Sequence, residues 1–120
     1  MKVNSRERGG RAEQYALDYL KSHGLKLVTR NFLCRMGEID LIMTHNKHLV
    51  FVEVRYRNNS KYGTPAATIS HIKQRRLTRT ANFYLQRQGN KTPCRFDVVA
   101  ITAQPKVKIE WIQNAFEATS

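Results

Sequence analysis

Asp40 and Glu53 stand in two apolar segments of this 120-residue chain, GEIDLIMTH and HLVFVEVRY. If these segments pair as a hairpin through a two-residue turn at 46–47, Asp40 lies directly opposite Glu53. Glu38 then lies opposite Arg55, and all four side chains are expected on one face, because neighbouring residues of a strand alternate. Like charges on facing positions destabilise a sheet, and a buried carboxylate is costly. Something positive is therefore expected between the two carboxylates.

A divalent cation between Asp40 and Glu53 would meet this need. Mg²⁺ takes oxygen ligands and is typically held by one or two carboxylates together with substrate phosphate oxygens, and Mn²⁺ suits the same ligands. Arg55 would point the same way and could hold a phosphate through two hydrogen bonds. The pattern therefore indicates a site at which a divalent cation such as Mg²⁺ or Mn²⁺ lies between Asp40 and Glu53 and a phosphate is held by Arg55.

Three simpler interpretations of the acids stay open. They could lie on a solvated face, although both faces of the hairpin are rich in apolar residues, which indicates strands covered on both sides. Arg55 and its basic neighbours could neutralise them as structural ion pairs. A loop of odd length would make the acids diagonal neighbours and weaken the geometry.

The elements that must position these residues follow from periodicity. Apolar residues recur at helical spacing in two segments, each followed by a glycine, and this predicts helices over 11–23 and 69–88. Alternating and β-branched stretches predict strands over 25–32, 39–43, 49–56, 95–102 and 107–112. This order predicts a single domain over residues 1–120 of the α/β class, with a mixed β-sheet flanked by two main helices.

The charge of the chain favours a polyanionic partner. Lys and Arg number 21 against 9 Asp and Glu, which gives a formal charge of +12. On the second helix the basic residues recur three or four positions apart, and a phosphate-facing role explains such a cluster better than stability does, although a solvated face is the alternative. The residues expected to contact nucleic acid are Arg11, Arg55, Arg57, Lys73, Arg75, Arg76 and Arg79.

Several classes of protein are disfavoured. No apolar run is long enough to cross a membrane, and the first residues lack the apolar stretch of a signal peptide, so a cytoplasmic protein without a membrane partner is expected. The sequence contains no glycine-rich phosphate loop, serine nucleophile motif or dinucleotide fingerprint.

The motifs GRAEQYALDYL, GEIDLI, LVFVEVRYR and RFDVVAI together resemble the YraN family of uncharacterised bacterial proteins over nearly the whole chain. That family is similar to the restriction-endonuclease-like superfamily of PD-(D/E)xK nucleases, especially archaeal Holliday-junction resolvases. The resemblance implies a restriction-endonuclease-like fold and a single nuclease-like domain.

Carried over to this sequence, the superfamily's aspartate falls on Asp40, its second acid on Glu53 and its helix-borne glutamate on Glu13. The resemblance thus implies that these three residues are metal ligands. From the residues alone, Glu13 could equally be a solvated helix glutamate beside the apolar stripe. The motif lysine falls on Arg55, and Ile39 replaces the proline. Because arginine stays protonated, it can clamp a phosphate but cannot easily take a proton from water.

Two functions are therefore in competition. The first is a metal-dependent endonuclease acting on DNA, including branched or otherwise structured DNA, with Asp40, Glu53 and Arg55 as its catalytic residues. A homodimer is expected if it cuts both strands symmetrically. The second is a nucleic-acid-binding module that kept the fold and lost the chemistry, for which Arg55 is the chief argument. A basic assembly factor that binds RNA would explain the charge but not the paired acids. DNA is expected over RNA.

Overall fold

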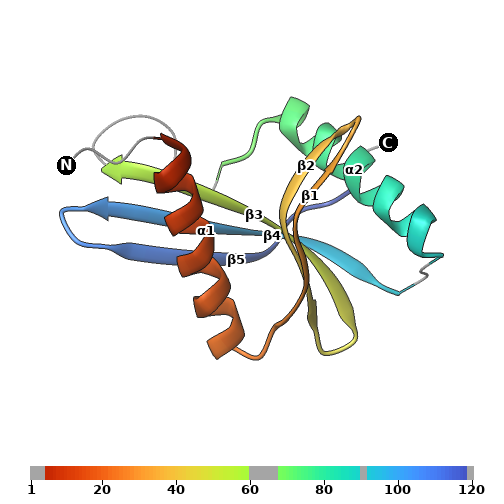
Figure 1. The fold of residues 1–120 in the computed structure, drawn as a ribbon, viewed down its shortest axis with the longest axis horizontal. Helices are drawn as coiled ribbons and strands as arrows, with labels where there is room; N and C mark the ends of the chain where they lie inside the picture. Colours follow the sequence, from red (N-terminus) through yellow and green to blue (C-terminus); the bar gives the residue numbers. More distant parts are fainter. Residues whose placement is uncertain (1–4, 60–67, 90–91, 119–120) are drawn as a thin grey trace.

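One five-stranded sheet lies between two helices in this computed structural model, which describes residues 5–59, 68–89 and 92–118 (Figure 1). Helix α1 covers one face of the sheet and helix α2 covers the other. The elements in chain order are α1 (Ser5–Ser22), β1 (Lys26–Cys34), β2 (Gly37–His45), β3 (His48–Asn59), α2 (His71–Gln88), β4 (Cys94–Gln104) and β5 (Lys108–Phe116).

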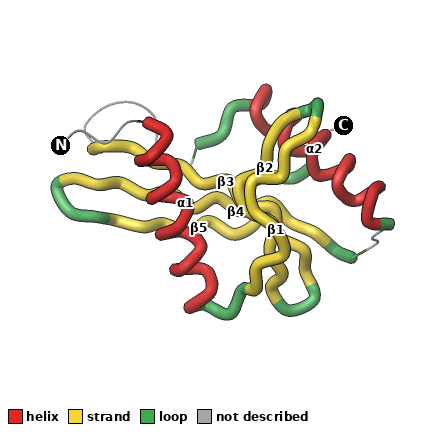
Figure 2. Tube along the Cα trace, in the orientation of Figure 1, coloured by secondary structure: helices red, strands yellow, loops and turns green. Residues whose placement is uncertain are grey.

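The sheet is mixed, as the sequence predicts. Its order is β1-β2-β3-β4-β5, and the neighbouring pairs are antiparallel except β3 and β4, which are parallel. A parallel pair needs a crossover, and α2 supplies it. The expected α/β class with two main helices is confirmed. Figure 2 shows β1 and β2 running at a steep angle to the far ends of β4 and β5, so the sheet is strongly twisted.

The helix boundaries follow from local residues. Helix α2 begins after Ser70, whose side chain accepts a hydrogen bond from the backbone N–H of Lys73, and it ends at Gly89 with a φ of 61°. Gly24, with a φ of 93°, lies just beyond α1. Helix α1 begins at Ser5 rather than at residue 11, because the polar residues that precede the apolar stripe continue the helix. No helix in the described part of the chain is long and apolar enough to cross a membrane.

Strand β3 is central and buried on both faces. Val50 and Val52 pack with α1, whereas Leu49 and Phe51 pack with α2. The hairpin with β2 has the expected register, since His45 pairs with His48. Each face therefore has its own apolar core, and β3 carries residues of both.

Strands β4 and β5 are tied together by a fully buried carboxylate. Asp97 accepts hydrogen bonds from the side chains of Arg95 and Trp111 and from the backbone N–H of Asn114. These donors satisfy the charge, which would otherwise be costly inside the sheet. The aspartate of the RFDVVAI motif is thus a structural residue of the β4–β5 pair.

Candidate functional site

The site begins where β2 separates from β3. Their pairing ends at Leu41 and Val52. Just beyond that pair the backbone N–H of Val54 donates to Asp40 Oδ2 over 2.8 Å. The side chain of Asp40 thus takes the donor that a continuing β2 backbone would have bound, and this bond holds the carboxylate at the fork between the strands.

The regular alternation of β2 breaks at Asp40. Ile39 packs in the core beside α2 and Leu41 packs in the core beside α1, although residues two apart normally share a face. On β1, Asn31 has a φ of 54° and lies between Arg30 and Phe32, which pair with Leu41 and Ile39 on either side of Asp40. The local bend turns the Asp40 side chain into the space between the faces.

Two other acids lie near the Asp40 carboxylate. Burial raises the pKa of Asp40 from 3.8 to about 8, and the nearby charge of Glu53 is the second cause. The Val54 N–H opposes this shift because it stabilises the charged form, whereas a hydrogen bond with Glu53 and the charge of Glu13 add to it. Glu53 therefore lies in contact with Asp40, and Glu13 is close enough for its charge to act on the Asp40 carboxyl.

Glu53 lies on the α2 side of β3 and is buried. The ammonium of Lys73 lies 2.8 Å from Glu53 Oε2. Arg55 lies on the same side of β3 as Glu53, because the strand is regular there and Val54 packs toward α1. Lys73, which the sequence analysis assigns to nucleic acid, thus also neutralises a buried carboxylate.

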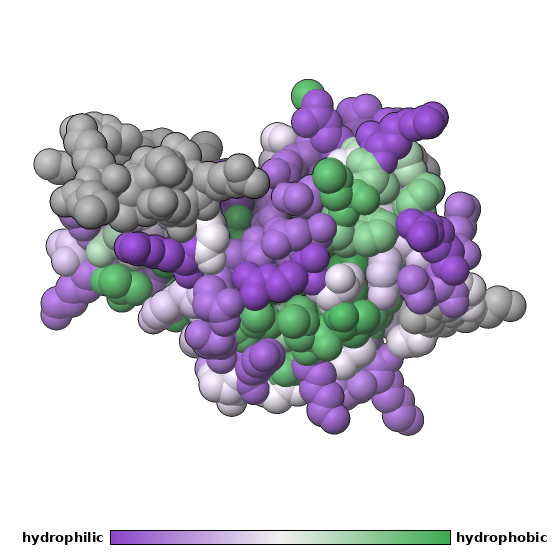
Figure 3. Space-filling view, in the orientation of Figure 1, coloured by the Kyte–Doolittle hydropathy of each residue, from purple (hydrophilic) through white to green (hydrophobic). Residues whose placement is uncertain are grey.

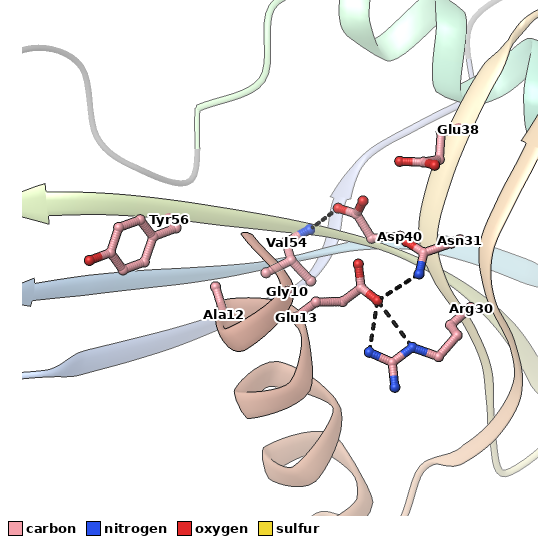
Figure 4. A pocket seen from close by; sticks show the side chains of 9 residues that line it. All are labelled: Gly10, Ala12, Glu13, Arg30, Asn31, Glu38, Asp40, Val54 and Tyr56. Carbon is pink, nitrogen blue, oxygen red and sulfur yellow. Dashed lines mark hydrogen bonds and ion pairs between the residues drawn. The ribbon is translucent and has the colours of Figure 1, made fainter. Parts of the chain in front are cut away.

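Glu13 approaches the fork from α1. Its Oε1 accepts hydrogen bonds from Nε and Nη2 of Arg30, at 3.1 and 2.9 Å, and from the amide of Asn31 at 3.1 Å. Figure 4 shows the other carboxylate oxygen pointing toward Asp40. Arg30 and Asn31 therefore orient Glu13 toward the fork.

An open pocket of about 630 Å³ lies on this side of the sheet, between α1 and strands β1 to β3 (Figure 4). Its polar wall is formed by the acids Glu13, Glu38 and Asp40 and by Arg30 and Asn31, the two β1 residues that donate hydrogen bonds to Glu13. The lining residues are Gly10, Ala12, Glu13, Arg30, Asn31, Glu38, Asp40, Val54 and Tyr56.

One expectation about faces is wrong. Glu38 lines the pocket beside α1, whereas Glu53 faces α2, so the four charged residues of the hairpin do not share one face. The cause is the bend at Asp40, which ends the period-two pattern of β2.

The donor chemistry at the fork fits a hard cation. Asp40 and Glu53 are adjacent carboxylates with oxygen atoms that Mg²⁺ or Mn²⁺ prefers, and a cation would relieve their repulsion. Glu13 and Glu53 each already have a basic partner. Among the described residues, no three His, Cys, Asp or Glu side chains form a ready-made metal cluster.

The basic residues assigned to nucleic acid lie on three elements. On α1 and α2 they are exposed: Arg11, Arg75, Arg76 and Arg79. Arg55 and Arg57 on β3 are partly buried. In Figure 3 hydrophilic side chains lie along the upper and right-hand margins, where α2 runs in Figure 1, beside a patch of apolar side chains. The exposed arginines of α2 are therefore accessible to a partner.

Arg30 and Asn31 belong to the pocket but were not assigned to a metal or nucleic-acid site from the sequence. The sequence gives no distinct signal for these two residues, because the same strand also carries the polar residues Lys26 and Thr29. Their partnership with Glu13 depends on how α1 packs on β1, which periodicity does not specify.

Comparisons with known proteins give consistent matches. The model of a family described as "Uncharacterised protein family UPF0102" matches residues 12–101. A UPF0102 protein of Chromohalobacter salexigens is 50% identical over 116 residues, which cover 96% of this chain and 94% of that protein. A UPF0102 protein of Nitrosococcus oceani is 48% identical over 96% of this chain and 95% of its own length.

Among solved structures, Pyrococcus furiosus SfsA in complex with Ca²⁺ is similar with a TM-score of 0.40 and 11% identity. The match covers 92% of this chain and 64% of that one. A similarity of this size carries no weight for function.

Proposed function

This chain belongs to the UPF0102 family, and from the geometry of its acidic fork we propose that it is a metal-dependent endonuclease acting on DNA, including branched or otherwise structured DNA. The membership rests on the match of the family model and on relatives close to half identical. The proposed metal-dependent cleavage is inferred from Asp40 and Glu53 at the fork.

One observation carries the proposal. Asp40 and Glu53 lie together in a largely buried place, and a backbone N–H fixes Asp40 there. Two neighbouring carboxylates are an unfavourable arrangement for a purely structural role. A divalent cation, which takes carboxylate and phosphate oxygens as ligands, would remove the repulsion between the two carboxylates by binding between them.

The residues have distinct roles in this proposal. Asp40 and Glu53 hold the cation, and Glu13 approaches it from α1. A bound Mg²⁺ or Mn²⁺ supplies charge stabilisation at the phosphate and raises the acidity of water. Arg55 stays protonated, and it binds a phosphate oxygen and stabilises developing negative charge. The basic residues of α2 hold neighbouring phosphates of the strand.

The test is a cleavage assay with Mg²⁺ or Mn²⁺ on linear, single-stranded and branched DNA. Asp40→Asn and Glu53→Gln are expected to lower the rate by about 100-fold or more, because each removes a ligand of the ion that stabilises the transition state. Glu38→Gln is the matched control, since Glu38 is exposed and lines the same pocket. Cleavage that persists in both fork variants would refute the proposal.

A nucleic-acid-binding module without cleavage is the second candidate. The ion pairs of Glu13 with Arg30 and of Glu53 with Lys73 favour it, because both acids are neutralised without a metal. Arg55 at the motif lysine position favours it as well. This candidate predicts salt-sensitive binding of DNA or RNA, no cleavage with either ion, and unchanged affinity in Asp40→Asn.

A further inference from the structure

We propose that the pocket beside α1 binds an unpaired nucleobase, stacked on Tyr56, next to the phosphate at Asp40. This inference rests on the proposed function and names the part of the substrate that the site selects. The preferred ligand at the cleavage position is then a single-stranded or frayed DNA segment rather than an intact duplex.

Tyr56 is placed for this role by strand β3. It lines the same pocket as Asp40 and Glu13. It lies two residues beyond Val54, whose N–H holds Asp40, and both side chains are therefore on the α1 side of β3. Two residues of a strand span roughly 6.6 Å. The ring is thus displaced from the fork by a distance of about one nucleotide in an extended strand.

The ring of Tyr56 is accessible from the pocket. The side chain is 38% exposed, and its hydroxyl donates to Asn58 Oδ1 at 3.3 Å, which steadies the ring along the strand. Figure 4 shows the ring at the opposite end of the pocket from Arg30 and Asn31.

Two positions of α1 leave space in this part of the pocket. Among the residues that the structure describes, a Cβ built at Gly10 meets no other atom within 4 Å, and Ala12 presents a single methyl group. A flat base therefore finds an aromatic surface on β3 and no large side chain from these two helix positions.

Stacking distinguishes an unpaired base from a paired one. In a duplex the faces of each base are covered by its neighbours, so an aromatic side chain gains contact only when a base leaves the stack. Stacking on an aromatic ring tolerates any base, because each has a π face. The pocket therefore selects the structure of the DNA rather than its sequence.

The experiment measures binding without cleavage, in EDTA, to a short thymine strand with one central 2-aminopurine and to its duplex. Affinity is followed by anisotropy and stacking by quenching of the 2-aminopurine fluorescence. Tyr56→Ala is expected to weaken single-strand binding roughly tenfold and to remove the quenching, while duplex affinity is unchanged. Tyr56→Phe retains both properties. Tyr15→Ala is the matched control, because Tyr15 is also exposed but does not line the pocket.

Each contrary outcome has a distinct meaning. Wild-type affinity and quenching in Tyr56→Ala would overturn this inference and leave the proposed function intact. An equal loss on single strand and duplex would also overturn it, because the effect would not depend on an unpaired base. A loss in Tyr56→Phe as large as in Tyr56→Ala would show that the hydroxyl matters and the ring does not. Failure of the wild type to bind any DNA, with Mg²⁺ as well as in EDTA, would overturn the proposed function together with this inference.

Discussion

The surroundings of Asp40 act on the pKa of its carboxyl in opposite directions. The N–H of Val54 stabilises its charged form, while burial and the charge of Glu53 stabilise the neutral form and prevail. The pKa of Asp40 is about 8 as a result. Without a cation, the folded chain therefore binds a proton at Asp40 at pH values where the unfolded chain has released it.

This difference makes stability depend on pH. Because the folded state binds more protons than the unfolded state between the two pKa values, the free energy of unfolding in EDTA is expected to fall as the pH rises from about 4 to about 8. Asp40→Asn, which keeps an oxygen acceptor for Val54, should lose most of this slope. Urea unfolding at pH 5 and pH 8 measures it.

Glu38→Gln is the control for this measurement, since Glu38 is exposed at the rim of the same pocket. It should keep the wild-type slope. An equally steep slope in Asp40→Asn would contradict the assignment of the proton to Asp40.

Lys73 neutralises the buried carboxylate of Glu53. Lys73→Gln is expected to lower the free energy of unfolding by about 1–2 kcal/mol in EDTA, less than for a fully buried pair because the lysine side chain is 44% exposed. Millimolar Mn²⁺ should reduce this loss, because the ion replaces the missing positive charge. Urea unfolding with and without Mn²⁺ measures both values.

Arg75→Gln is the matched control, because Arg75 is an exposed basic residue on the same helix and should change stability little. A loss in Lys73→Gln that is identical with and without Mn²⁺ would argue against a cation beside Glu53.

At the scale of elements, the register of the hairpin could be predicted and its faces could not. The tight turn sets the register, and Asn46 tolerates the φ of 57° that it adopts there. No local pattern in the sequence indicates the bend at Asp40 or the positive φ of Asn31 on the neighbouring strand. The partners of Glu13 and Glu53 lie on other elements, and their contacts depend on how the helices pack on the sheet, so the sequence predicts the acids but not what neutralises them.

The turn between β1 and β2 requires glycine at position 37. Gly37 has a φ of 151°, and a Cβ there would lie 3.1 Å from Thr80 Oγ1 on α2. Gly37→Ala is expected to lower the free energy of unfolding by about 1–3 kcal/mol, from backbone strain and from this contact. Chemical unfolding measures the change.

Gly10→Ala provides the comparison, since a Cβ there meets nothing within 4 Å and alanine favours a helix. It should leave stability unchanged or slightly higher. A Gly37→Ala variant as stable as the wild type would show that the turn moves away from α2 at no cost.

The whole molecule carries a formal charge of +12, and exposed arginines gather on α2. Such a surface attracts a polyanion over a long range and makes its affinity depend on salt. The positive potential of this surface attracts phosphates toward the acids at the fork.

Removing two charges from α2 should therefore change the salt dependence of DNA binding. The variant Arg75→Gln/Arg79→Gln is expected to lower the slope of log affinity against log salt by about one for each residue. Lys106→Gln/Lys108→Gln is the control, because the β4–β5 turn lies at the opposite end of the molecule from α2 (Figure 1). Equal changes in the two variants would show that the net charge of the protein, and not the arginines of α2, determines the salt dependence of DNA binding.

The most direct test of the acidic fork is calorimetric titration of the metal-free protein with Mn²⁺ at pH 8. We expect about one ion per chain, binding lost in both Asp40→Asn and Glu53→Gln, and binding retained in Glu38→Gln. Absence of binding in the wild type, or binding that Asp40→Asn leaves unchanged, would contradict the claim that these carboxylates converge to hold a cation.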